Sequence, residues 1–150
     1  MILRVLSVSS LVVIADRLTK WLLLRILSEG ESIRVAPGVF HITLVLNSGA
    51  AFGLFKGRSL FFTVFSVLII AFICFYAIRG GCKDLLILTA LGLILGGAAG
   101  NLIDRVLFGY VIDFLDFRVW PVFNIADASI TIGAFILAIR FVFNKRCCTT

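Results

Sequence analysis

The chain has 150 residues, which is short for more than one domain; 61% of them are apolar and only 15% are charged. A soluble globule of this size cannot bury so much apolar surface, and a disordered chain would need the opposite composition. The net charge of +6 comes from basic residues that mostly flank apolar runs, which indicates membrane anchoring and argues against nucleic-acid binding. The sequence therefore predicts a single integral membrane domain over residues 1–150.

The first apolar segment, residues 3–27, is predicted to be a transmembrane helix that stays in the protein. Arg4 and the apolar run after it are typical of a signal peptide, but no small-residue cleavage site follows. Charged residues crowd the second half of the segment. Asp16 and Lys20 are four residues apart on one helix face and can pair. A structural ion pair and a role in substrate binding both remain open for them.

The connection that follows, residues 28–58, predicts a β-hairpin. Apolar and polar residues alternate from Ile33 to Leu46 on both sides of Pro37-Gly38, and period two around such a turn is typical of two antiparallel strands. His41 falls on the second strand, where we expect it to face solvent.

Two further transmembrane helices are predicted at residues 59–78 and 85–103, which are free of charged residues. At about 1.5 Å per residue each is roughly 28–30 Å long, the thickness of the hydrocarbon core. Gly92, Gly96 and Gly100 recur every four residues in the later segment, with alanines beside them. This stripe of small residues predicts close helix packing.

A polar group ends the third predicted helix. Asn101, Asp104 and Arg105 have spacings of three and four and share one helix face. Because Arg105 adjoins Asp104, we expect this carboxyl to stay ionised, which suits a structural or binding role better than an acid role.

A fourth transmembrane helix is predicted at residues 124–143, so that both termini lie on one side of the membrane. The two sides carry equal numbers of basic residues. Short connections weigh most in the positive-inside rule, and the basic residues of the turn at 79–84 favour cytoplasmic termini.

Two aspartates in apolar surroundings lie on one membrane face. Asp113 precedes the fourth helix and Asp127 opens it, one turn after Asn124. Two carboxyls brought together in a low dielectric share a proton, as an aspartic protease requires. The alternatives are a helix N-cap for Asp127 and a solvated loop charge for Asp113. Asp116 is read as a solvated loop charge.

Other chemistries find little support. Metal-ligand spacings, nucleophile elbows and phosphate-binding glycine loops are absent from the sequence. The cysteines show no pairing pattern and are read as unpaired thiols: Cys74, Cys82, Cys147 and Cys148. A proton-coupled carrier or channel subunit, with intramembrane aspartates as proton relays, is the main alternative function. A non-catalytic membrane scaffold is the other.

Four motifs, in order, resemble the bacterial lipoprotein signal peptidase (signal peptidase II) family. They are DRLTK at 16–20, NSGAAFG at 47–53, GAAGNLIDR at 97–105 continuing into GYVIDF at 109–114, and FNIAD at 123–127. The resemblance covers nearly the whole chain.

The resemblance implies an aspartic endopeptidase of the bacterial cytoplasmic membrane. It would cut the signal peptide from prolipoproteins just before a diacylglyceryl-modified cysteine, with Asp113 and Asp127 as the catalytic pair. The supporting or substrate-binding residues that carry over are Asp16, Lys20, Asn47, Asn101, Asp104, Arg105 and Asn124.

The resemblance also implies an all-α membrane fold of four transmembrane helices with an extracytoplasmic β-cradle and a short surface helix near Lys56 and Arg58. It implies cytoplasmic termini and no metal or cofactor. We expect a monomer whose partners are prolipoprotein substrates and membrane lipids. Small residues around Gly53 and at 97–100 are expected to leave room for acyl chains.

Overall fold

The computed structural model describes residues 1–48, 59–80 and 83–143. The expected surface helix near Lys56 and Arg58 lies outside these residues, as does Gly53. Among the cysteines, Cys74 is described and is a free thiol. In these parts of the chain the elements are α1 (Ile2–Ile26), β1 (Ser32–Ala36), β2 (Phe40–Asn47), α2 (Ser59–Arg79), α3 (Leu85–Phe108), β3 (Val111–Asp116) and α4 (Ile125–Phe143).

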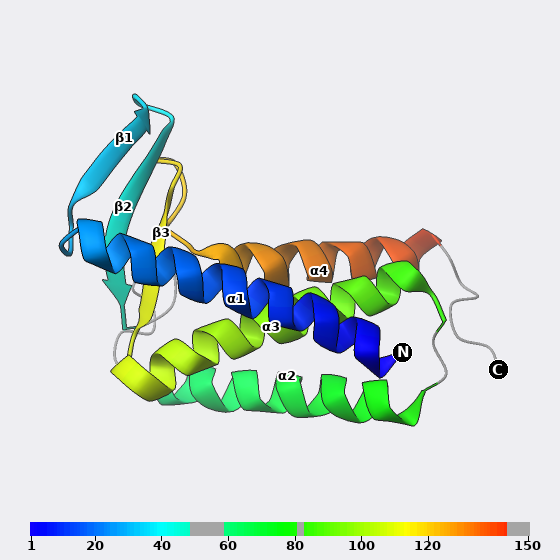
Figure 1. Cartoon of the computed structure of the whole chain (residues 1–150). Helices are drawn as coiled ribbons and strands as arrows, with labels where there is room; N and C mark the ends of the chain where they lie inside the picture. The colour runs from blue at the N-terminus through cyan, green and yellow to red at the C-terminus, as the bar shows by residue number, and fades with distance from the viewer. Residues whose placement is uncertain (49–58, 81–82, 144–150) are drawn as a thin grey trace.

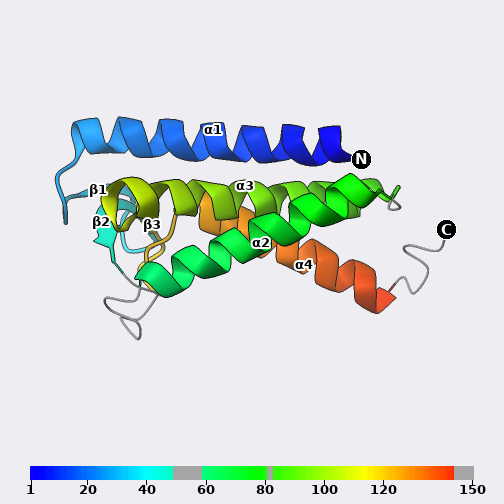
Figure 2. The same cartoon turned by 90° about the horizontal axis from the view of Figure 1, so that it is seen from below.

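The four described helices run along a common direction, and the sheet lies across one end of them (Figures 1 and 2). α3 packs against α1, α2 and α4 and is therefore the central helix. The start of α1 and the end of α4 lie at the end opposite the sheet (Figure 1). The first turn of α4 and the last turns of α1 and α3 consequently meet beneath the sheet.

Glycines on α3 allow this close packing, as the sequence predicts. A Cβ added at Gly96 would lie 2.7 Å from the Ser9 carbonyl oxygen of α1. At Gly100 it would lie 3.3 Å from the Ala126 side chain of α4, and at Gly97 it would overlap the Ala126 carbonyl. The expectation that the small residues at 97–100 leave room for acyl chains is therefore wrong for Gly97 and Gly100, whose space is filled by α4 and by Asp16 of α1, whereas Ala98 lines a cavity.

Among the described residues, three helices are long and apolar enough to cross a membrane: α2, α3 and α4. α1 has the length, but it carries Asp16, Arg17, Lys20 and Arg25 in its second half. α3 runs five residues beyond the predicted end of the apolar span at 103, so the helix includes Asp104 and Arg105 together with Asn101.

The predicted hairpin is present, and a third strand extends it. β1 and β2 pair antiparallel, with Ser32 opposite Thr43. β3 pairs antiparallel with β2 and places Asp113 opposite Val45. β3 does not alternate between apolar and polar residues because nearly all of it is buried. His41 is also buried, contrary to expectation, because this third strand covers it.

Candidate active site

The chain around Asp113 and Asp127 folds back on itself and brings the two residues together. α3 ends at Gly109, whose φ of 79° is a left-handed conformation suited to glycine, and β3 starts two residues later. After β3 the chain returns alongside it, because Phe114 and Leu115 both donate their N–H groups to the Phe123 carbonyl. α4 then begins beside β3.

The N-terminus of α4 is capped by two reciprocal hydrogen bonds between side chains and main-chain N–H groups. Asn124 Oδ1 accepts the N–H of Asp127 at 2.9 Å, and Asp127 Oδ2 accepts the N–H of Asn124 at 3.3 Å. This is the geometry of a capping box. Asn124 is therefore the N-cap, and Asp127 lies in the first turn, where its carboxylate also faces the helix dipole.

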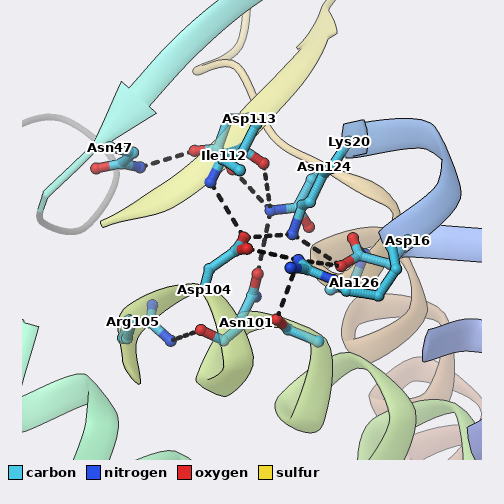
Figure 3. A network of polar contacts seen from close by, with 12 residues as sticks. Asp16, Lys20, Asn47, Asn101, Asp104, Arg105, Ile112, Asp113, Asn124 and Ala126 are labelled. Carbon is cyan, nitrogen blue, oxygen red and sulfur yellow. Dashed lines mark hydrogen bonds and ion pairs between the residues drawn. The ribbon is translucent and has the colours of Figure 1, made fainter. Parts of the chain in front are cut away.

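Asparagine amides hold the two carboxyls in place. Asn124 Nδ2 donates to Asp113 Oδ1 at 2.7 Å, while Asn47 Nδ2 donates to Asp113 Oδ2 at 2.9 Å (Figure 3). Asn101 Nδ2 donates to Asp127 Oδ1 at 2.7 Å. Asn124 also donates to Asn101 Oδ1 at 3.1 Å. One connected network thus contains both carboxyls, and Asp113 is a buried strand residue, not a solvated loop charge.

Both aspartates line one cavity of about 330 Å³ between α2, α3, α4 and the sheet. Its polar wall contains Asn47, Asn101 and Arg105, and its apolar wall contains Phe62, Phe65, Ile69, Ala98, Val111, Trp120, Val122, Phe123 and Ile130. The Arg105 guanidinium lies 5.5 Å from the Phe62 ring centre. A mostly apolar cavity with a few convergent polar groups is typical of an enzyme site.

The pKa of the Asp113 carboxyl is raised to about 7, first by burial and second by the nearby charge of Asp127. The amides of Asn47 and Asn124 and the ammonium of Lys20 oppose this shift. Near neutral pH the Asp113 carboxyl is therefore populated in both protonation states, and the pair titrates as a unit.

A second set of charges lies behind this pair. Lys20 Nζ is 2.8 Å from Asp16 Oδ2 and 2.7 Å from Asp104 Oδ2, and all three side chains are buried. Arg17 contacts the same carboxylates at 3.0 and 2.5 Å. The predicted Asp16–Lys20 pair is confirmed, but Asp104 pairs across helices and not with Arg105. We call these four residues, Asp16, Arg17, Lys20 and Asp104, the α1–α3 ion cluster.

The structure thus divides the candidate residues between two places. Asn47, Asn101, Arg105 and Asn124 lie with the aspartate pair, whereas Asp16, Lys20 and Asp104 lie in the ion cluster. Arg17 was missed as a site residue, because its partner Asp104 is 87 positions away. The position of Arg17 within the DRLTK motif, beside Asp16, was the one feature of the sequence that could have identified it.

Asp116 differs from the sequence prediction of a solvated loop charge. It is the last residue of β3 and is buried. Its carboxylate accepts hydrogen bonds from the Thr43 hydroxyl and the Arg118 main-chain N–H, both at 2.8 Å. It does not line the cavity that holds the aspartate pair.

The fold and site define a class: a small membrane protein of apolar helices with a buried carboxyl pair at one end of the bundle. The family model described as Signal peptidase (SPase) II matches residues 8–143, and the chain belongs to this family. It is accordingly a peptidase.

Curated relatives agree with this assignment. A lipoprotein signal peptidase of Halothermothrix orenii is 47% identical over 127 residues, covering 85% of this chain and 87% of that protein. One from Gloeobacter violaceus is 49% identical, covering 86% of this chain and 76% of that protein.

Two solved structures of bacterial membrane enzymes are similar to the fold. One has a TM-score of 0.87 and 34% identity, covering 95% of this chain and 89% of the other. The second has a TM-score of 0.84 and 35% identity, covering 93% of each chain.

Proposed function

We propose that the chain is an aspartic endopeptidase whose catalytic residues are Asp113 and Asp127. The observation that carries the proposal is the single network in which Asn124 bonds both carboxyls at one cavity. The raised pKa of Asp113 supports it, because an aspartic protease needs one ionised and one protonated carboxyl at its working pH.

The reaction follows from that shared proton. The ionised carboxylate takes a proton from a water molecule, whose oxygen attacks the scissile carbonyl carbon. The protonated carboxyl donates a hydrogen bond to the carbonyl oxygen as negative charge develops there. A proton then passes to the leaving nitrogen, the carbon–nitrogen bond breaks, and the pair is ready for another cycle.

The proposed substrate is a prolipoprotein cut just before a cysteine that carries a diacylglyceryl group. Support comes from the relatives' name and from the cavity wall, which is apolar around the carboxyls. Each acyl methylene buried would contribute about 0.8 kcal/mol of binding. Selectivity would then rest on placing the lipid, with few side-chain contacts.

We further propose that α1 is a fourth transmembrane helix of one domain. Its charged residues Asp16 and Lys20 point inward and are paired, while Leu11, Leu18 and Trp21 are exposed on its outer face. An intramembrane charge is tolerated when it is paired inside a bundle in this way.

The proposed orientation places both termini in the cytoplasm and the sheet with the aspartates at the extracytoplasmic face of a bacterial cytoplasmic membrane. Basic residues at the other end, Arg79, Lys83 and Arg140, favour that end as cytoplasmic. We expect the working unit to be a monomer, because one chain supplies both carboxyls.

The direct test is to incubate the purified protein in liposomes with a diacylglyceryl-modified prolipoprotein and to measure the masses of the products by mass spectrometry. We expect two products, the free signal peptide and a protein that begins with the lipidated cysteine. Cleavage at other bonds, or no cleavage by folded protein, would contradict the proposed function.

A further inference from the structure

The α1–α3 ion cluster contacts the main chain next to each catalytic aspartate. Asp16 Oδ1 accepts the N–H of Ala126 at 3.2 Å, and Asp104 Oδ2 accepts the N–H of Ile112 at 3.2 Å (Figure 3). Ala126 immediately precedes Asp127, and Ile112 immediately precedes Asp113. The two carboxylates that hold Lys20 therefore also hold the two segments that carry the proposed catalytic pair.

We propose that the α1–α3 ion cluster is a positioning unit that fixes the separation of Asp113 and Asp127 and, through the charge of Lys20, their shared protonation state. This inference rests on the proposed function. Its members are positioning residues, because none of the four side chains lines the cavity.

The burial of the cluster argues for a role beyond holding α1 in place. The side chains of Asp16 and Asp104 are 0% exposed and that of Lys20 is 1% exposed. Apolar packing could hold two helices together at no greater cost, whereas buried ions need several well-placed bonds to offset their desolvation. Here the extra bonds of the two carboxylates go to two main-chain N–H groups, and both adjoin the aspartates.

The charges facing Asp113 come from every helix at the site except α2. Lys20 of α1 and Arg105 of α3 are cations, and Asp127 of α4 and Asp104 of α3 are anions. The four charges of the cluster sum to zero. Removal of one cation or one anion from it should therefore move the pKa of Asp113 in opposite directions.

The experiment compares the pH dependence of cleavage for Lys20→Met and Asp16→Asn in the full-length protein. Loss of the ammonium should move the profile to higher pH, and loss of the carboxylate should move it to lower pH, each by on the order of 0.5–1 pH unit. The double variant removes one charge of each sign, so its profile should return to that of the parent.

Two further variants complete the experiment: one removes a partly exposed cation of the cluster, and the other is a control outside it. Arg17→Gln removes a cation from a side chain that is 27% exposed, so it should fold and move the profile to higher pH. Arg140→Gln is the control, because it breaks an ion pair between α4 and Asp84, the N-cap of α3, at the end of the bundle far from the aspartates. It should lower the melting temperature and leave the profile in place.

The proposal is overturned if Lys20→Met and Asp16→Asn both move the profile in one direction, or if both behave as Arg140→Gln does. Asp113→Asn is assayed in the same series. If that variant cleaves normally, the proposed function fails, whatever the cluster variants do. If it is inactive and the cluster variants leave the profile unmoved, only the positioning role fails.

Discussion

Asp113 combines burial with a neighbouring carboxyl, and this environment has a consequence for stability as well as for chemistry. Its pKa is about 7 in the folded chain, against 3.8 for a free carboxyl. Between these values the folded protein binds more protons than the unfolded chain does. The contribution of Asp113 to the free energy of unfolding therefore falls as the pH rises from about 4 to about 7.

The first prediction follows from the direction of this pH dependence. The melting temperature of the detergent-solubilised protein should increase when the pH is lowered from 7 to 5. In Asp113→Asn that increase should shrink, because an amide does not titrate there. An equal increase in both proteins would show that Asp113 does not have a raised pKa.

Asp116 gives the second prediction at this scale. Its carboxylate accepts the N–H of Arg118, whose φ of 65° is a left-handed conformation, and the hydroxyl of Thr43. Asp116→Ala removes the charged acceptor of both hydrogen bonds, so we expect it to lower the free energy of unfolding by about 1–3 kcal/mol. Glu29→Ala, at an exposed position, is the control and should change it little.

The elements differ in how far the sequence predicts them. The four helices follow from long apolar runs, and their predicted ends are close to the observed ones except at α3. There the uncharged run ends at residue 103, but the helix continues through Asp104, whose partners Lys20 and Arg17 lie on α1. A local pattern does not reveal partners on another helix.

β3 shows the same limit for strands. Its sequence VIDFLD lacks strict alternation, because the strand is covered on both faces, and so period two could not identify it. The candidate aspartates were found from their apolar surroundings and Asn47 from a motif, whereas the pairing of Arg17 with Asp104 became visible only in three dimensions.

Helix packing yields the third prediction. Gly97→Ala would place a methyl group against the Ala126 carbonyl, next to Asp127, and α4 would have to shift. We expect a loss of about 1–3 kcal/mol in stability together with reduced turnover, measured by thermal unfolding and cleavage. The control Ala71→Leu adds volume at an exposed position of α2 and should do neither. Normal turnover by folded Gly97→Ala would show that the position of α4 is not critical.

At the scale of the whole molecule, the bundle places its polar chemistry at one end and its lipid-facing surface along its length. The fourth prediction concerns orientation. In a cysteine-free background, Val119→Cys should react with an impermeant thiol reagent in intact spheroplasts, since Val119 is 92% exposed near the sheet. Lys83→Cys, at the opposite end, should react only after lysis, and the reverse pattern would invert the proposed topology.

The most direct measurement of the central claim is cleavage of a diacylglyceryl-modified prolipoprotein by Asp113→Asn, Asp127→Asn and the double variant, with melting temperatures recorded. Each single variant should lose nearly all turnover while remaining folded, because neither carboxyl can act as both base and acid alone. The double variant should be little worse, since residues that act as a unit are not additive. Asp84→Asn, at the other end of α3, should keep its turnover. A folded Asp127→Asn or Asp113→Asn protein with near-normal turnover would contradict the account.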